Sequence, residues 1–235
     1  MSEPARGFFV TGTDTGVGKT VVSCALVRAL RAQGSDVGAM KPVETGVTEA
    51  GPLDAIALRA AAGNRDPLDE VCPQRFALPA APTVAADAEG RSVDIEAVHK
   101  AYAALVARHE LMIVEGAGGM LVPAADGVTM VDLAGALELP LVLVARAALG
   151  TINHTLLSLE VAELRNVTLA GVVISHADGP TSDPDLANLE SLRQALGERL
   201  VGEIPHLESG TESPAAEDAI DLGALLHALV QARAG

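Results

Sequence analysis

The stretch from Gly12 to Thr20 reads GTDTGVGKT, and it decides the fold that the rest of the sequence predicts. Loops of the form G-x-x-x-x-G-K-[ST] join a strand to a helix and bind phosphates. Here the first glycine lies one residue further from Gly18 than that spacing requires. An apolar run precedes the loop and an apolar helical pattern follows it, which is the order that such a loop needs. The stretch therefore predicts a nucleoside triphosphate site with one additional residue in its rim.

Each residue type in this loop has a physical use at a phosphate. Glycines let several backbone N–H groups converge on one anion, and the helix that begins near Lys19 adds its positive end. Lys19 supplies a full charge, and Thr20 supplies a hydroxyl suited to Mg²⁺. An ordinary glycine-rich turn would need neither the lysine nor the hydroxyl, so we interpret the loop as a phosphate site.

Short β-branched runs alternate with longer helical patterns along the chain, which is typical of parallel strands joined by helices. The strands are expected at Phe8 to Thr11, Val37 to Lys41, Leu111 to Glu115, Leu141 to Ala145, Leu169 to Ser175 and Leu200 to Ile204. The helices are expected at Lys19 to Gln33, Asp54 to Ala62, Asp94 to Arg108, Val131 to Leu137, Ile152 to Leu164, Asp185 to Leu196 and Ala219 to Ala232. Strand cores such as LMIV and LVLV are apolar on both faces, as strands between two helical layers should be. We predict a single α/β domain over residues 1–235, with a P-loop NTPase-like fold and a mostly parallel sheet that has helices on both faces.

The stretch from Gly63 to Gly90 is the least regular part of the chain, and we expect an ordered excursion over the surface there. Cys72 lies in this stretch, and Cys24 lies in the first expected helix. Two cysteines at this spacing fit neither a disulfide framework nor a metal site. Both are expected to be thiols in a reducing compartment.

Composition excludes several classes of function. The formal charge is −15 and aromatic residues make up 2% of the chain, which argues against nucleic acid as a partner. No apolar run reaches about 18 residues, and the first ten residues lack a signal-peptide pattern. We expect a cytoplasmic protein that does not bind a membrane.

Three more polar residues stand at the end of an expected strand or at the start of an expected helix. Lys41, one of only three lysines, closes the second strand and suits a small anion. Glu115 follows four apolar residues and precedes the small residues Gly116, Ala117, Gly118 and Gly119, which is where such folds hold a metal-binding acid and let phosphates approach the backbone. Asp54 opens a helix, and it is either an N-cap or a further oxygen ligand of Mg²⁺; the sequence leaves both open.

Together these motifs resemble the dethiobiotin synthetase family over almost the whole chain. The matching segments are GTDTGVGKT at 12–20, KPVETG at 41–46, LDAIAL at 53–58, VEGAGG at 114–119, LGTINHT at 149–155 and GEIP at 202–205. The longer phosphate loop belongs to that pattern. The resemblance implies an ATP-dependent cyclo-ligase of biotin biosynthesis, which uses 7,8-diaminopelargonic acid and CO₂ or bicarbonate. It also implies a carbamate, a carbamic–phosphoric anhydride and closure of a cyclic urea.

The resemblance implies a role for individual residues as well. Lys41 would be catalytic together with Lys19, and Thr20, Asp54 and Glu115 would hold Mg²⁺. The expected nucleotide site comprises Gly16, Val17, Gly18, Lys19, Thr20, Val21, Asp54, Glu115, Gly116, Ala117, Gly118, Ser175, His176, Ile204, Pro205 and His206. The expected substrate site comprises Thr15, Thr45, Gly150, Thr151 and Asn153, the last three from the adjacent subunit of a homodimer.

Two positions depart from the family pattern. Gly16 stands where many relatives have an acid, and Ser175 with His176 stand where relatives often have Asn-Asp to read adenine. The preference for ATP over other triphosphates therefore stays open.

Two alternatives share the same phosphate loop. A cobyrinic acid amidating synthase would need a glutaminase domain, for which the chain has no room. A ParA-like partitioning ATPase would be expected to carry another lysine early in the loop and a basic or amphipathic surface. Thr13 to Val17 contain no lysine, and the chain is acidic.

Overall fold

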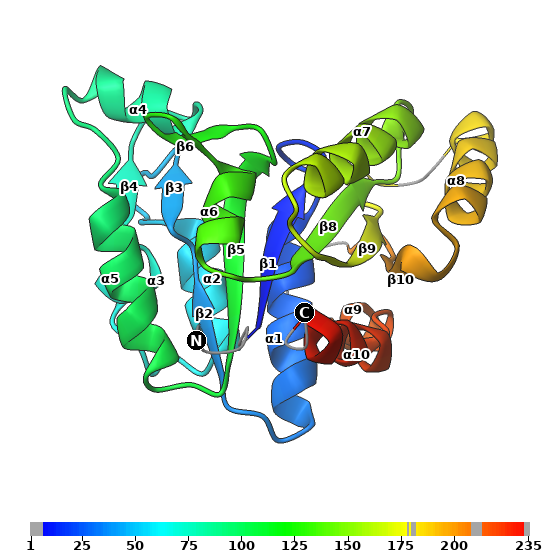
Figure 1. Cartoon of the computed structure of the whole chain (residues 1–235), viewed down its shortest axis with the longest axis horizontal. Helices are drawn as coiled ribbons and strands as arrows, with labels where there is room; N and C mark the ends of the chain where they lie inside the picture. The colour runs from blue at the N-terminus through cyan, green and yellow to red at the C-terminus, as the bar shows by residue number, and fades with distance from the viewer. Residues whose placement is uncertain (1–6, 178, 180–181, 208–212, 233–235) are drawn as a thin grey trace.

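The computed structural model describes residues 7–177, 179, 182–207 and 213–232. A six-stranded sheet runs through the middle of the molecule, in the order β10-β9-β8-β1-β5-β2, and every pairing in it is parallel (Figure 1). Its strands are β1 (Gly7–Gly12), β2 (Val37–Met40), β5 (Leu111–Gly119), β8 (Leu141–Arg146), β9 (Leu169–Ser175) and β10 (Leu200–Ile204). All six strands predicted from apolar runs are present, and the bounds differ by a few residues at most.

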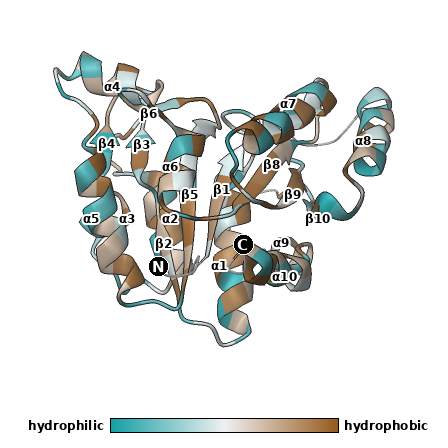
Figure 2. Ribbon diagram, in the orientation of Figure 1, coloured by the Kyte–Doolittle hydropathy of each residue, from teal (hydrophilic) through white to brown (hydrophobic). Residues whose placement is uncertain are grey.

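Helices cover both faces of the sheet, and successive residues of β1 pack alternately against the two helical layers. Phe8 and Val10 belong to a core with α1, α2, α9 and α10, whereas Phe9 belongs to a core with α5, α6, α7 and α8. The long helices are α1 (Lys19–Ala32), α2 (Leu53–Ala61), α5 (Ile95–Val106), α6 (Met130–Ala136), α7 (Thr151–Leu164), α8 (Asp183–Leu196) and α10 (Leu222–Ala232). In Figure 2 strand β8 is largely brown, while α5 mixes brown and teal as an amphipathic helix does.

The stretch from Gly63 to Gly90 contains more regular structure than a surface excursion implies. It forms α3 (Leu68–Val71), β4 (Gln74–Phe76) and α4 (Pro82–Ala88), and β4 pairs in parallel with β3 (Val43–Thr45) in a small separate sheet. Cys72, between α3 and β4, is fully buried, so its expected place on a surface excursion was wrong. A second small sheet joins β6 (Pro123–Ala125) to β7 (Val128–Thr129).

The C-terminal helix begins later than predicted. The expected helix from Ala219 to Ala232 is replaced by α9 (Pro214–Asp218) and α10, separated by Ala219 to Asp221. Ile220 forms an isolated bridge with Gly202, and the Asp221 N–H donates to the Val201 carbonyl. These bonds hold the chain extended along β10, and α10 starts after them. In the described part of the chain, no helix is long and apolar enough to cross a membrane.

Candidate active site

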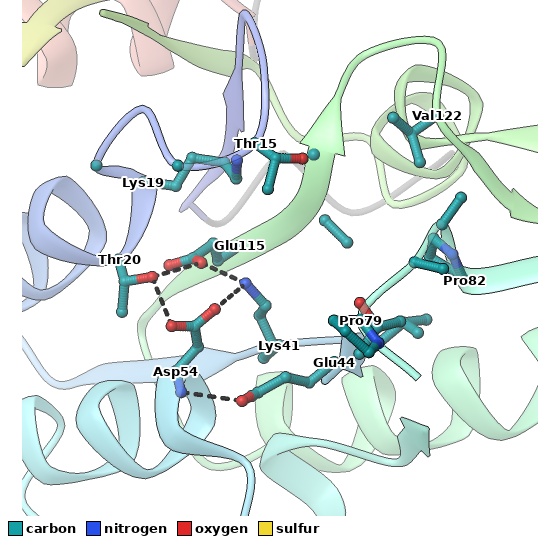
Figure 3. A pocket seen from close by; sticks show the side chains of 18 of the residues that line it. Thr15, Lys19, Thr20, Lys41, Glu44, Asp54, Pro79, Pro82, Glu115 and Val122 are labelled. Carbon is teal, nitrogen blue, oxygen red and sulfur yellow. Dashed lines mark hydrogen bonds and ion pairs between the residues drawn. The ribbon is translucent and has the colours of Figure 1, made fainter. Parts of the chain in front are cut away.

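A cavity of about 590 Å³ opens at the carboxyl edge of β1, β2 and β5 (Figure 3). The phosphate loop forms one side of it, and the β3 strand with residues 79–82 forms the other. Its lining residues are Thr15, Gly16, Gly18, Lys19, Thr20, Val21, Lys41, Val43, Glu44, Thr45, Asp54, Pro79, Ala80, Ala81, Pro82, Glu115, Ala117, Gly118 and Val122.

The phosphate loop turns sharply into α1 at Gly18, whose φ is 92°. A Cβ at Gly18 would lie 2.3 Å from the Ser175 hydroxyl oxygen, so the loop packs against the end of β9. Lys19 is 7% exposed, and its Nζ donates to the Asp14 carbonyl at 2.9 Å. Burial lowers the pKa of Lys19 to about 8. The loop therefore holds a desolvated ammonium group at the positive end of a helix.

The sheet register brings Lys41 to Glu115. Met40 of β2 pairs with Val114 of β5, so the residues that follow them emerge side by side. Lys41 Nζ donates to Glu115 Oε1 at 2.5 Å and to Asp54 Oδ2 at 2.8 Å. One ammonium group thus joins two carboxylates that lie 61 positions apart in the sequence (115 minus 54).

Thr20 completes this cluster from α1. Its Oγ1 lies 2.9 Å from Asp54 Oδ1 and 3.0 Å from Glu115 Oε1, and its proton can be donated to either (Figure 3). The other oxygen of Glu115, Oε2, is buried and has no hydrogen-bond partner in the described part of the structure.

Lys41 and Asp54 perturb each other's ionisation. Burial alone would lower the pKa of Lys41, but the charges of Glu115 and Asp54 and the bonds to both raise it above its ordinary value. Burial would likewise raise the pKa of Asp54, but the charge of Lys41 and the bonds from Lys41 and Thr20 hold it below its usual range. Both groups are therefore charged at neutral pH, and Lys41 is a fixed cation.

The oxygen atoms of this cluster fit Mg²⁺. Hydroxyl and carboxylate oxygens are the donors that Mg²⁺ prefers, and the unpartnered Oε2 of Glu115 is an additional acceptor. No group of three or more His, Cys, Asp and Glu side chains with metal-binding geometry occurs among the described residues. Two carboxylates with Thr20 match an ion that takes its other oxygens from water and phosphates, as Mg²⁺ commonly does.

Asp54 does not cap its own helix. The N-cap of α2 is Pro52, and the Asp54 side chain instead points to Thr20 and Lys41. The N-cap alternative was therefore wrong. The first amides of α2 are bonded by Glu44 of β3, whose Oε1 accepts from the Asp54 N–H at 3.1 Å and whose Oε2 accepts from the Ala55 N–H at 2.9 Å. Sequence reasoning missed Glu44, since nothing in KPVETG indicates a bond to residues ten positions away.

Other predicted residues lie around the cavity in different ways. Thr15, Val21, Thr45, Ala117 and Gly118 line it. Val17 is buried in the core, and Gly116 packs against the Phe9 ring, which a Cβ there would approach to 2.8 Å.

The residues predicted to read the base lie at the carboxyl ends of β9 and β10, outside the lining of this cavity. His176 and Glu203 are joined by Nε2 and Oε1 at 2.7 Å, and the same carboxylate accepts from Arg193. His206 Nδ1 lies 3.1 Å from the His176 carbonyl oxygen. Ile204 is buried and Pro205 is exposed. The structure thus brings these residues together as a second group beside the loop.

The predicted substrate residues at the start of α7 are also outside the cavity lining. Gly150 is the left-handed N-cap of α7, Thr151 is buried, and Asn153 is exposed. A single chain does not bring them to Thr15 and Thr45.

Comparisons with known proteins agree with the motifs. The family model described as AAA domain matches residues 6–213. The chain is 49% identical over 226 residues to an ATP-dependent dethiobiotin synthetase BioD of Anaeromyxobacter dehalogenans (strain 2CP-C), covering 96% of this chain and 99% of that one. It is 35% identical to the protein of that name in Bacillus subtilis (strain 168), covering 94% and 98%.

Solved structures bear on the fold alone. A ParA family ATPase from Chlorobium tepidum TLS superposes with a TM-score of 0.53 at 15% identity, covering 97% of this chain and 98% of that one. A chain of the MinC:MinD cell division protein complex of Aquifex aeolicus gives 0.54 at 14% identity, covering 98% and 97%. These values confirm the P-loop NTPase-like fold and give the ParA-like alternative no support beyond it. Since sequence identity extends over nearly the full length of the synthetases, the chain belongs to the ATP-dependent dethiobiotin synthetase family.

Proposed function

We propose that this chain converts 7,8-diaminopelargonic acid, CO₂ and ATP to dethiobiotin, ADP and phosphate. Membership of the dethiobiotin synthetase family supports an ATP-dependent step of biotin biosynthesis. The observation that carries the finer proposal is the cluster of Thr20, Lys41, Asp54 and Glu115 at the mouth of a phosphate loop. It unites anion-binding and cation-binding groups in one cavity.

The reaction balances in three steps. One amine adds to CO₂ and loses a proton, which gives a carbamate. A carbamate oxygen attacks the γ-phosphorus of ATP, ADP leaves, and a carbamic–phosphoric anhydride forms. The second amine attacks the anhydride carbon, the C–O bond to phosphate breaks, and loss of a proton completes the cyclic urea. Closure is favoured because both reacting groups belong to one bound molecule.

Lys19 and the loop amides would hold the phosphates of ATP. The Lys19 ammonium is already desolvated, and it donates to the backbone carbonyl of Asp14, which a phosphate oxygen can replace. A charge-assisted bond to phosphate is stronger than a bond to a neutral carbonyl.

Lys41 would act as a charge and not as a base, because its raised pKa keeps it protonated. From the cavity wall it would offset the negative charge of the carbamate and the transferring phosphoryl group. Thr20, Asp54 and Glu115 would hold Mg²⁺, which when bound supplies positive charge to the β- and γ-phosphates.

Thr15 and Thr45 would orient the diamine through their hydroxyls, since both line the cavity. Gly150, Thr151 and Asn153 would come from a second copy of the chain in a homodimer, with the N-terminus of α7 toward the carboxylate of the substrate. The exposed leucines at and near this helix, Leu149 and Leu157 among them, support such an interface. Ser175, His176, Ile204, Pro205 and His206 would surround the base.

We also propose that residues 1–235 form one domain and that the protein works in the cytoplasm without nucleic acid or membrane partners. Two buried cysteines outside any disulfide support a reducing compartment, and the acidic composition supports the absence of nucleic acid partners.

A turnover assay tests the proposal. The protein is incubated with the diamine, bicarbonate, Mg²⁺ and each nucleoside triphosphate in turn, and phosphate release is compared with formation of the cyclic urea by mass spectrometry. We expect both products in equal amounts, and only with the diamine present. Phosphate release that is independent of the diamine, with no urea, would contradict the proposal.

A further inference from the structure

Glu44 is a buried acid in the wall of the active-site cavity. It lies on the short strand β3 and is 6% exposed. Figure 3 shows its carboxylate beneath Asp54, directed toward the main-chain nitrogen of that residue. Burial of an acid close to other carboxylates is costly, and burial first, with a contribution from the charge of Asp54, raises the pKa of Glu44. A residue kept there at such a cost calls for a specific role.

Glu44 performs the capping that the start of α2 does not provide for itself. The first amides of a helix have no partners within the helix. Pro52, the N-cap of α2, makes no side-chain cap bond. Glu44 accepts from two of these amides at 3.1 and 2.9 Å, with one oxygen for each. A negative charge at this end of a helix is also favourable.

The same two bonds fix the residue that carries the Asp54 carboxylate. The Asp54 N–H is held by Glu44, while the Asp54 side chain is bonded to Thr20 and Lys41. Apolar packing does little to hold the preceding residue, because Leu53 is 61% exposed. Glu44 therefore holds the main chain of this first turn at the cavity wall, while Thr20 and Lys41 hold the Asp54 side chain.

We propose that Glu44 is a positioning residue that places the Asp54 carboxylate for binding of the metal–nucleotide complex. The inference rests on the metal role proposed for Asp54. Groups that orient metal ligands typically affect metal affinity by about 10–100-fold.

The test separates metal-dependent binding from nucleotide binding in general. The Kd of a non-hydrolysable ATP analogue is measured as its Mg²⁺ complex and again in EDTA. The Kd in EDTA divided by the Kd with Mg²⁺ reports contacts made through the metal. Glu44→Ala should lower this ratio by about tenfold or more, in line with loss of ligand orientation. Glu44→Gln keeps one acceptor oxygen and nearly the same shape, and it should lower the ratio less.

Asp94→Ala is the matched control. Asp94 caps α5 by accepting from the Ala97 N–H at 2.9 Å, and it does not line the cavity. This variant should lose stability in urea as a cap deletion does, but keep the wild-type ratio. A merely structural role for Glu44 would give the same pattern, with reduced stability and an unchanged ratio, and would overturn the inference.

Asp54→Asn and the double variant Asp54→Asn with Glu44→Gln complete a double-mutant cycle for this Kd ratio. If Glu44 acts through Asp54, the two effects on the ratio will be strongly non-additive. Additive effects would contradict the inference. A wild-type protein whose affinity does not depend on Mg²⁺ would instead overturn the proposed metal role, and the inference with it. The two failures are thus distinguishable.

Discussion

Replacement of Lys41 by methionine removes the ammonium that lies between Asp54 and Glu115. Lys41 is 3% exposed and Glu115 is fully buried, so the variant leaves a carboxylate without a counter-ion in the protein interior. Loss of one partner from a buried ion pair costs about 3–5 kcal/mol. The lower figure is the better expectation here, because the Asp54 side chain is 41% exposed and remains partly hydrated. In a domain of this size, about 3 kcal/mol corresponds to a fall in Tm of roughly 6–12 °C.

Urea unfolding followed by circular dichroism at pH 7 measures this loss. Lys100→Met is the matched control, since Lys100 is exposed and should change stability by less than about 0.5 kcal/mol. Addition of Glu115→Gln to Lys41→Met should recover part of the loss, because it removes the uncompensated charge. A cost below about 1 kcal/mol for Lys41→Met would place the cluster among ordinary surface ion pairs and refute the reasoning.

Three further predictions follow from single residues. The pKa of Lys19 is lowered to about 8, so its ammonium is lost as the pH rises through that value. In a titration from pH 7 to 9.5 in EDTA, ATP affinity should therefore fall by about tenfold per pH unit above that pKa, whereas Lys19→Arg should show no such fall. Burial raises the pKa of the Cys72 thiol to about 12, so iodoacetamide at pH 8 should leave Cys72 unmodified in the native protein and alkylate it in urea, as peptide mass spectrometry would show; native alkylation would contradict its burial. Gly18→Ala should lower the free energy of unfolding in urea by about 1–3 kcal/mol and abolish nucleotide binding, because of backbone strain and contact with Ser175. Gly34→Ala, with a similar φ and open space around it, should lose stability only, and equal effects of the two variants on binding would count against the proposed fit of the loop.

The sequence predicted the central sheet well because its strands are apolar on both faces. Runs such as LMIV admit few other interpretations once GTDTGVGKT marks the first turn. The three-residue strands β3 and β4 could not be found in this way, since they are too short for any periodicity. The late start of α10 depends on the bridge between Gly202 and Ile220, which is a tertiary contact.

The candidate site was predictable where one loop carries its chemistry and less so where distant segments meet. Lys19 and Thr20 follow from local spacing. The N-cap use of Asp54 could be ruled out only by a structure, because a helix start and a metal site favour the same residue type in the same place. Glu44 was missed because its partners belong to another element.

Strand β5 is hydrogen-bonded to β1 on one side and to β2 on the other. The loop with Lys19, the Glu115 carboxylate and Lys41 therefore share a rigid frame, whereas Asp54 comes from a helix outside the sheet. For protein engineering, this makes the turn at 48–51 the place to vary: a library of lengths and compositions there would shift the Asp54 carboxylate relative to Lys19, Lys41 and Glu115, without redesign of the sheet core.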